Sequence, residues 1–301
     1  MKVLVLLGGT SNEREVSFRS GGAVADALRA AGYEVLEYDP AEGYAGLSQF
    51  VGKVDCVFPI LHGKGGEDGS IQLELEKLNL KYLGSDSKVS RLCFNKNEFK
   101  KILNKLSILT PKWEVVNGEN VAQSELINHP YVLKPIGGGS TIDAYIVRDP
   151  KSAGYDEQVF EKYQQMLLEE LIEGDEVTVS VLSDTALPVI EIIPPEGQEF
   201  DFENKYNGAT KEICPPKNVS AEHQTEAQKS AVKIHEIVGA RHLSRVDFMI
   251  DRSGKLYVLE LNTMPGLTGQ SLYPKSAAEA GLPMPELVSE FVKMVIHDYN
   301  L

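Results

Sequence analysis

The residues whose chemistry is easiest to interpret lie on a predicted β-hairpin near the C-terminal end. Residues 245–250 alternate polar and apolar side chains, as a half-buried strand does, and a second strand follows at 256–262. A turn that pairs Asp251 with Gly254 places Arg245 opposite Glu260, and it places Asp247 opposite Val258. Residues i and i+2 of a strand share a face. The hairpin should therefore have Arg245, Asp247, Glu260 and Asn262 on one side and Phe248, Ile250, Leu259 and Leu261 on the other.

This polar face is suited to binding a divalent cation. Two carboxylates and one amide oxygen are hard ligands of the kind that Mg²⁺ takes, and they leave room for water and phosphate oxygens. The alternative is a solvated strand face on which Arg245 neutralises Glu260, because acidic strand faces are common. Residues 262–268, Asn-Thr-Met-Pro-Gly-Leu-Thr, favour the metal, since they put backbone N–H groups and hydroxyls just beyond it.

A glycine-rich stretch is the second candidate for chemistry. Three glycines, 137–139, precede two hydroxyl residues, 140–141, between two predicted strands. Glycines let backbone N–H groups approach phosphate closely. No Lys-Ser/Thr pair follows the last glycine, so this is not a Walker loop, and alone it could be a flexible hairpin tip. Lys134 at the strand end and Lys96 on a preceding helix could supply the cations, although either could be a solvated surface charge.

Alternating strands and helices must position these residues. Strands are expected at 2–7, 34–38 and 54–61, with a helix after Gly9 that stops at Gly32, which implies a parallel sheet covered by helices. A boundary is expected at 82–86. Beyond it the sequence predicts a helix at 89–106, strands at 131–134, 144–147, 167–171, 177–182 and 187–193, a long functional loop at 200–216, and helices at 221–238 and 284–299.

Composition narrows the class of protein. The chain has 301 residues, enough for two or three lobes, with 42% apolar and 25% charged residues. A net charge of −14 argues against a nucleic-acid partner, so local cations must hold any anionic substrate. Three scattered cysteines without a CxxC pair are typical of reduced thiols in the cytoplasm. No apolar run approaches the roughly 20 residues of a membrane span, and the N-terminus is interpreted as a buried strand rather than a signal peptide.

Several short motifs follow one another along the chain. They are Leu-Gly-Gly-Thr-Ser at 7–11 with Glu-Arg-Glu-Val-Ser at 13–17, His-Gly-Lys-Gly-Gly-Glu-Asp-Gly at 62–69 with Gln72, Lys-Pro at 134–135 with its glycine loop, Glu-Glu-Leu-Ile at 169–172 through Glu176, Lys-Tyr at 205–206, Arg-Val-Asp at 245–247, and Glu-Leu-Asn-Thr-Met-Pro-Gly-Leu-Thr at 260–268 ending at Ser-Leu, 271–272. In this order they resemble the D-alanine–D-alanine ligase family of the ATP-grasp superfamily over essentially the whole chain.

The resemblance implies an α/β (α+β) protein with a three-lobed ATP-grasp fold and an N-terminal open parallel-sheet lobe. The lobes are expected at 1–86 (substrate), 87–173 (central, with the glycine loop as a lid) and 174–301 (metal and catalytic site). ATP would lie between the last two lobes, with two Mg²⁺ ions, or Mn²⁺, as cofactors. The residues implied to bind ATP are Lys96, Lys134, Gly139, Ser140, Thr141, Glu169, Glu170, Ile172, Glu176 and Lys205, and the implied metal ligands are Asp247, Glu260 and Asn262.

The remaining implied roles concern the two amino-acid substrates. Glu15 matches the residue that orients the ammonium of the first D-alanine, with His62 near its carboxylate. Tyr206, on the mobile loop, would hydrogen-bond with Glu15 and Ser140. Arg245, the Gly266 N–H, Ser271 and Leu272 would serve the oxyanion and the second carboxylate. The family forms D-alanyl-D-alanine through an acyl phosphate for peptidoglycan synthesis, and a homodimer without membrane or nucleic-acid partners is implied.

One position departs from the family pattern. Asp143 stands where the family usually has glycine. A carboxylate facing the phosphates would weaken ATP binding, whereas one that points to solvent or caps a turn would not. Three other functions remain as alternatives: ligation with a different second substrate, a nucleotide-binding protein that no longer ligates, and a dinucleotide-dependent oxidoreductase, although no GxGxxG follows the first strand.

Overall fold

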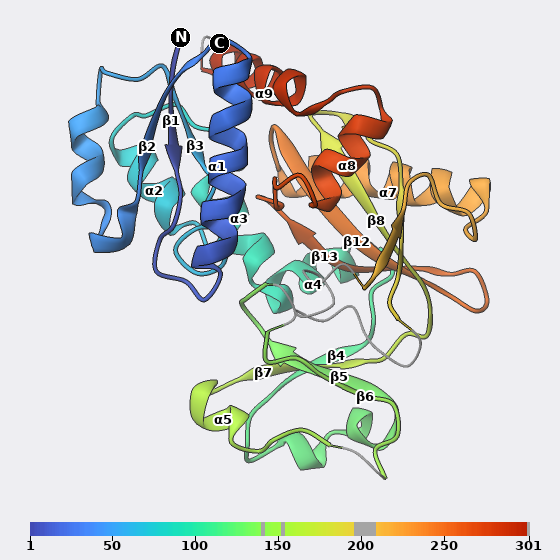
Figure 1. The fold of residues 1–301 in the computed structure, drawn as a ribbon. Coiled ribbons are helices and arrows are strands. Elements are labelled where there is room, and N and C mark those ends of the chain that lie inside the picture. Colours follow the sequence, from blue (N-terminus) through green and yellow to red (C-terminus); the bar gives the residue numbers. More distant parts are fainter. Residues whose placement is uncertain (140–141, 152–153, 196–208, 300–301) are drawn as a thin grey trace.

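The computed structural model describes residues 1–139, 142–151, 154–195 and 209–299. The chain forms three sheets, each in a separate stretch of sequence (Figure 1). Near the N-terminus, β1 (Lys2–Leu6) lies between β2 (Glu34–Tyr38) and β3 (Cys56–Pro59), and all pairs are parallel. Connecting them are α1 (Arg14–Ala30) and the 3₁₀ helices Pro40–Glu42 and Tyr44–Phe50, followed by α2 (Ser70–Lys77).

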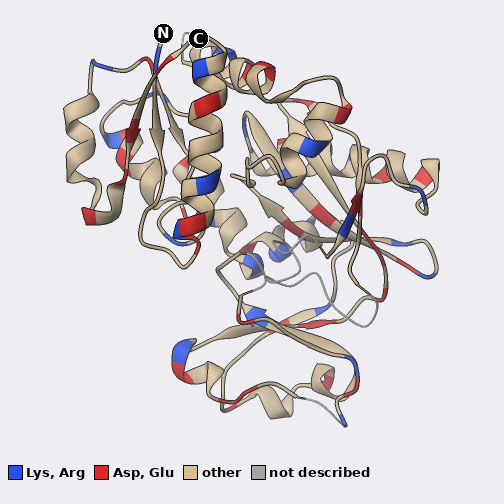
Figure 2. Ribbon diagram, in the orientation of Figure 1, with Lys and Arg blue, Asp and Glu red and all other residues tan. Residues whose placement is uncertain are grey.

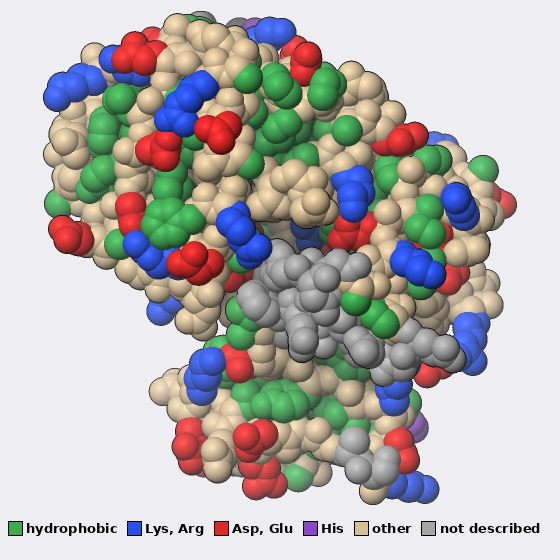
Figure 3. Space-filling view, in the orientation of Figure 1, with side chains coloured by type: hydrophobic (Ala, Val, Ile, Leu, Met, Phe, Trp, Pro, Cys, Tyr) green, Lys and Arg blue, Asp and Glu red, His purple; other side chains and the backbone are tan. Residues whose placement is uncertain are grey.

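The central sheet is antiparallel, in the order β4-β7-β5-β6. Its strands are β4 (Trp113–Val116), β5 (Tyr131–Pro135), β6 (Tyr145–Val147) and β7 (Met166–Glu170). The 3₁₀ helices Val121–Gln123 and Glu125–Asn128 and the short helix α5 (Val159–Lys162) pack on it around a small core that includes Tyr131, Leu133 and Leu168. Figure 3 shows this lobe as a separate mass, set off from the other two by an indentation.

The C-terminal sheet runs β11-β10-β8-β12-β13 through antiparallel pairs, with β9 beside β8. Helix α7 (Ala221–Val238) covers this sheet. Ser220 caps its N-terminus, because the Ser220 side chain accepts a hydrogen bond from the His223 N–H. The helix ends at Gly239, whose φ of +75° favours glycine. The strands are β8 (Gly174–Leu182), β9 (Thr185–Ala186), β10 (Ile190–Ile193), β11 (Lys211–Ile213), β12 (Leu243–Asp251) and β13 (Leu256–Asn262).

The hydrophobic cores do not follow the expected lobe boundaries. The helices α3 (Ser87–Phe94) and α4 (Lys96–Lys105) contribute Cys93, Phe99 and Leu103 to the core beneath the C-terminal sheet. Of the last helices, α8 (Leu272–Glu279) packs on β8 of the C-terminal sheet, whereas α9 (Met284–Asp298) packs against α1 and β3 of the N-terminal lobe. Each expected lobe contains one of the described sheets, but the stretch from 87 to 105 belongs by packing to the C-terminal lobe.

Two predicted elements differ in the structure. The single helix expected at 89–106 is interrupted at Asn95, whose side chain accepts from the Glu98 N–H and starts α4. Asn95 also forms an isolated bridge with Gly137, so the interruption joins α4 to the glycine stretch. The expected loop at 200–216 contains β11 in its described part, and residues 200–208 lie outside the described residues.

The predicted register of the hairpin is wrong. Arg245 lies opposite Asn262, and Asp247 lies opposite Glu260. A β-bulge follows, because the next residue of β12, Phe248, pairs with Val258. The extra residue is Leu259, which therefore turns toward the cavity described below rather than the core. The polar face survives because the pairing of Arg245 and Asp247 is displaced by two residues of β13, and residues two apart on a strand share a face.

No described helix has the length and apolar character needed to cross a membrane. Figure 2 shows Lys and Arg on α4, and charges of both signs on the central sheet and on the C-terminal sheet. Charges of opposite sign thus approach one another where these two lobes meet.

Candidate active site

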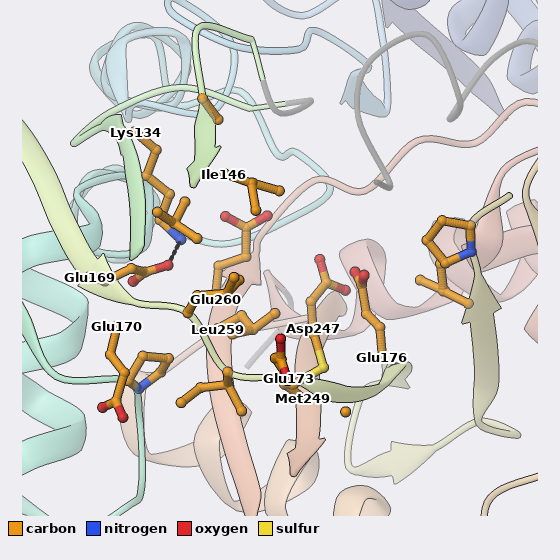
Figure 4. Close-up of a pocket in the computed structure, with 18 of the residues that line it drawn as sticks. Lys134, Ile146, Glu169, Glu170, Glu173, Glu176, Asp247, Met249, Leu259 and Glu260 are labelled. Carbon is orange, nitrogen blue, oxygen red and sulfur yellow. Dashed lines mark hydrogen bonds and ion pairs between the residues drawn. The ribbon is translucent and has the colours of Figure 1, made fainter. Parts of the chain in front are cut away.

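A cavity of about 540 Å³ lies between the central and C-terminal sheets. Its walls come from the ends of β5, β6 and β7 on one side and from β8, β10, β12 and β13 on the other (Figure 4). Seven of the residues expected to bind ATP and two of the expected metal ligands line it: Lys96, Lys134, Gly139, Glu169, Glu170, Ile172, Glu176, Asp247 and Glu260. The structure therefore brings together residues that are up to 164 positions apart, from Lys96 to Glu260.

Lys96 is held at the junction of the two lobes by the first turn of α4. Its backbone N–H donates to the Ile136 carbonyl at 2.9 Å. Its Nζ donates to the Gly138 carbonyl at 2.6 Å and lies 3.4 Å from Oε2 of Glu260. The ammonium group is thus placed between the glycine stretch and one expected metal ligand, where a phosphate could exchange for either partner.

A buried cluster of three charges lies behind the cavity wall. Glu169 is 3% exposed and forms ion pairs with Lys134 through Oε1 and with Lys100 through Oε2, the latter at 2.9 Å. Burial alone would raise the pKa of Glu169, but the two ammonium groups lower it below its usual value. Glu169 is therefore charged at neutral pH.

Lys100 is a residue that sequence reasoning missed. Its side chain is 0% exposed, and Nζ donates to Thr110 Oγ1 at 2.7 Å and to the Pro111 carbonyl at 3.3 Å. Thr110 Oγ1 in turn donates to the Val258 carbonyl on β13 at 2.8 Å. The spacing of four residues from Lys96 to Lys100 along a helix was the available indication that both point toward the same neighbours.

The expected metal ligands sit opposite each other on the hairpin. Asp247 accepts from Arg245 Nε and Nη2 at 2.8 and 2.7 Å, from Thr178 Oγ1 at 2.5 Å and from Asn262 Nδ2 at 3.1 Å. Arg245 thus pairs with Asp247, not with Glu260 as the alternative interpretation had it. Directly opposed strand residues have Cβ atoms about 5 Å apart. The carboxylates of Asp247 and Glu260 can therefore reach one ion between them.

The oxygens present fit a hard divalent cation. Asp247 and Glu260 both face the cavity, and Asn262 lies beside them, with its Nδ2 donating to Asp247. Among the described residues, no three His, Cys, Asp or Glu side chains form a metal cluster, so the third protein ligand would have to be the amide. In the part of the chain that the structure describes, eight carboxylates but only four Lys or Arg side chains line the cavity. A polyphosphate entering this acidic space needs cations to accompany it.

The N-terminal lobe contributes a different glutamate from the one expected. Glu15 lies in the first turn of α1 and is exposed, so the structure does not bring it to the site. Glu13 precedes the helix and is 6% exposed. Its Oε2 is so close to Gly63 and Gly139 that a Cβ on either glycine would lie 2.8 or 3.2 Å from it. Glu13 therefore reaches from the first lobe to the glycine stretch.

His62 and Glu67 lie in the same part of the site as Glu13 and Gly63. His62 is buried, with Nε2 3.2 Å from Ser20 Oγ, and burial together with nearby Arg245 lowers its pKa to about 4. It is neutral at pH 7. Glu67, another residue that sequence reasoning did not select, accepts from the Gly63 N–H at 2.6 Å and lines a small hollow with Lys96, Glu260 and Asn262. Burial, and then Glu13, raise the pKa of Glu67.

The turn after β13 brings the last expected residues together. A Cβ on Gly266 would lie 2.9 Å from Ser271 Oγ, so these two residues are in contact. Ser271 Oγ also accepts from the Thr268 N–H at 3.1 Å, within the turn that precedes α8. The Leu272 side chain packs on Ile190 and Ile192, which leaves only its backbone for a ligand. Ser140, Thr141, Lys205 and Tyr206 lie outside the described residues.

Comparison with known proteins agrees with this arrangement. The family model described as D-ala D-ala ligase C-terminus matches residues 102–293, and the one described as D-ala D-ala ligase N-terminus matches 39–85. The chain is 38% identical over 297 residues to a D-alanine–D-alanine ligase of Nitratidesulfovibrio vulgaris, covering 98% of each chain, and 38% identical over 292 residues to one of Aquifex aeolicus, covering 96% and 99%. The chain belongs to the D-alanine–D-alanine ligase family.

Solved structures of the family have the same fold. The D-alanine–D-alanine ligase of Bacillus anthracis complexed with ATP superposes with a TM-score of 0.84 at 30% identity, covering 100% of this chain and 99% of that one. The Coxiella burnetii ligase gives a TM-score of 0.83 at 26% identity, covering 100% and 95%. The three-lobed fold expected of the family, with a parallel sheet in the N-terminal lobe, is confirmed, and the other two sheets are antiparallel.

Asp143, which follows the glycine stretch, faces away from the cavity. Asp143 Oδ2 accepts from Lys162 Nζ at 2.5 Å and from Tyr163 Oη at 2.6 Å. Its φ is +56°, in the left-handed region that the family glycine would adopt without strain. The carboxylate therefore does not face the phosphates, which was the first of the two expected placements. It does not simply point to solvent either, because Lys162 and Tyr163 bind it.

Proposed function

We propose that this chain joins two D-alanine molecules into D-alanyl-D-alanine at the expense of ATP and with Mg²⁺ bound, as a step in peptidoglycan precursor synthesis. The observation that carries the proposal is the cavity between two lobes of a D-alanine–D-alanine ligase family member. Lys96 and Lys134 approach it from one side, and the opposed pair Asp247 and Glu260 approaches from the other.

ATP is proposed to lie in this cavity with its phosphates toward Lys96 and Lys134. The adenine and ribose then lie along the wall formed by β7 and the start of β8, which carries Glu169, Glu170, Ile172 and Glu176. Asp247, Glu260 and Asn262 would hold two Mg²⁺ ions, or Mn²⁺, which when bound neutralise charge on the transferring phosphoryl group. The lysines add positive charge on the opposite side of the phosphates.

The reaction is proposed to pass through an acyl phosphate. A carboxylate is a poor electrophile because its charge repels nucleophiles and oxide is a poor leaving group. A carboxylate oxygen of the first D-alanine attacks the γ-phosphorus, the bond to ADP breaks, and the carboxyl carbon becomes activated. The second D-alanine, after its ammonium loses a proton, attacks this carbon through nitrogen. The C–N bond forms, the bond from carbon to the phosphate oxygen breaks, and phosphate leaves.

Residues of the first and third lobes are proposed to orient the two substrates. Glu13, in place of Glu15, binds the ammonium of the first D-alanine, and neutral His62 hydrogen-bonds near its carboxylate. Arg245 uses Nε and Nη2 to bind Asp247, which leaves Nη1 to donate to the tetrahedral oxyanion together with the Gly266 N–H. Each such donor is commonly worth about 3–4 kcal/mol. Ser271 and the Leu272 backbone serve the second carboxylate, and Ser140, Tyr206 and Lys205 keep the roles predicted for them.

We further propose that the enzyme works in the cytoplasm as a homodimer. Cys56 and Cys93 are free, buried thiols, as expected in a reducing compartment. The dimer is inferred from the family, and the net charge of −14 supports the expectation of no nucleic-acid partner. Sedimentation of the purified protein at micromolar concentration should give twice the mass of one chain.

The function is tested by incubating the protein with ATP, Mg²⁺ and single D- or L-amino acids, with phosphate release and product mass followed. D-Alanine alone should support release of one phosphate per dipeptide formed. Phosphate release with a different amino acid, or mixed dipeptides in excess over D-alanyl-D-alanine, would assign another second substrate. ATP binding without any amino-acid-dependent turnover would indicate a homologue that does not ligate.

A further inference from the structure

Asp143 interrupts a stretch of chain that forms a wall of the nucleotide cavity. The residues on either side of it, Ile142 and Ala144, both line the cavity, as does Ile146 on β6. The side chain of Asp143 instead reaches the C-terminal end of α5, where Lys162 and Tyr163 bind the same carboxylate oxygen. The Ile142 and Ala144 residues that line the cavity and the Asp143 carboxylate thus lie on opposite sides of the segment 142–144.

The partners of Asp143 are themselves fixed to the central lobe. Tyr163 packs against the core of this lobe, which includes Val159 and Met166. Its N–H donates to the Val159 carbonyl at 2.9 Å and closes α5. Lys162 Nζ lies 5.1 Å from the centre of the Tyr163 ring, in position for a cation–π contact, and half of its side chain is exposed. The carboxylate is therefore bound to a point that does not depend on the glycine stretch.

The backbone at this position favours glycine. At φ +56° a residue with a Cβ is strained, and Asp tolerates this region better than most because of its short polar side chain. A glycine would remove the strain, but it would also remove both contacts with α5. The contacts to Lys162 and Tyr163 offset this local cost and lower the pKa of Asp143, so the carboxylate stays charged at neutral pH.

We propose that Asp143 is a positioning residue that anchors residues 142–144, which lead into β6, to α5, and so fixes the wall of the nucleotide cavity. This rests on the proposed function only in naming ATP as the ligand. The anchor has two consequences. It holds Ile142 and Ala144 against the bound nucleotide, and it keeps a negative charge paired with Lys162 and directed away from the phosphates.

The test compares four variants: Asp143→Gly, Asp143→Asn, Lys162→Met and Tyr163→Phe. Kd for a non-hydrolysable ATP analogue with Mg²⁺, and KM for ATP at saturating D-alanine, should rise about two- to five-fold in Lys162→Met and Tyr163→Phe, as expected for one partly exposed pair or hydrogen bond. kcat and KM for D-alanine should stay within about two-fold. Glu161→Gln, a neighbouring exposed change on α5, is the matched control and should have no effect.

Coupling between the residues separates anchoring from general damage. If Asp143 and Lys162 act together, Asp143→Asn with Lys162→Met should weaken analogue binding no more than Asp143→Asn alone. Asp143→Gly should also weaken it. Tighter binding in Asp143→Gly, additive effects in the double variant, or unchanged Kd in all four variants would overturn the anchor. Because analogue binding needs no turnover, an inactive wild type would refute the proposed ligation and still leave this comparison decisive.

Discussion

Replacing Lys100 by Met tests the buried charge cluster most severely. The substitution keeps the length of the side chain but removes an ammonium group that is 0% exposed and contacts Glu169, Thr110 and Pro111. Removing one partner of a buried pair commonly costs 3–5 kcal/mol because the other charge is left uncompensated. Lys134 still pairs with Glu169, so we expect the low end, about 3 kcal/mol of unfolding free energy.

The assay is urea unfolding of the two proteins, followed by the fluorescence of Trp113, which lies 5.5 Å from Lys100 Nζ. Lys101→Met on the same helix is the matched control. Its side chain is 53% exposed and pairs with Glu98, so it should change stability by less than about 1 kcal/mol. A loss in Lys100→Met no larger than that in Lys101→Met would refute this account of the cluster.

Three further predictions follow from named contacts. Glu13→Gln should raise KM for D-alanine about ten-fold or more because a buried charged hydrogen bond is lost, while Glu15→Gln, exposed on α1, should leave it unchanged; equal effects in steady-state assays would contradict the assignment. Glu260→Gln should raise the Mg²⁺ concentration for half-maximal activity about ten-fold or more, and an unaltered Mg²⁺ titration would remove Glu260 from the metal site. Burial lowers the pKa of His235 to about 4, so as pH falls the unfolded chain takes up a proton on this histidine before the folded protein does. Protonation of His235 should therefore lower the free energy of unfolding by at most about 2 kcal/mol between pH 7 and pH 5. In unfolding measurements at each pH, the His235→Gln variant should show a smaller drop than the wild type.

Sequence reasoning was most successful where a residue's strand and face decide its position. Lys134 and Glu169 share one face of the neighbouring strands β5 and β7, and Asp247 and Glu260 share the polar face of a hairpin, so a cavity between the two sheets collects all four. The register of that hairpin was not predictable because a β-bulge changes the pairing without any glycine to mark it. The polar face of the hairpin was nevertheless predicted correctly, because the error in register left Asp247 and Glu260 on the same face.

The errors arose where one residue of sequence changes the direction of a side chain. In Glu13-Arg14-Glu15, the helix begins at Arg14, so Glu15 turns to solvent while Glu13 stays in the preceding turn beside Gly63. No local pattern fixes that starting residue to within one position. Lys100 was missed because a lysine is normally exposed, and only tertiary packing reveals the Glu169 carboxylate that stabilises it. The same applies to Asp143, whose partners lie 19 and 20 residues further along the chain.

The central claim is that D-alanine is activated by ATP through its own carboxylate, and isotope transfer tests it directly. The protein is incubated with ATP, Mg²⁺ and D-alanine labelled with ¹⁸O in both carboxylate oxygens, and the released phosphate and the dipeptide are analysed by mass spectrometry. The account predicts one ¹⁸O atom in each phosphate, and a D-alanyl-D-alanine that keeps one label in its peptide carbonyl and two in its terminal carboxylate. Unlabelled phosphate, or phosphate release that does not depend on D-alanine, would contradict it.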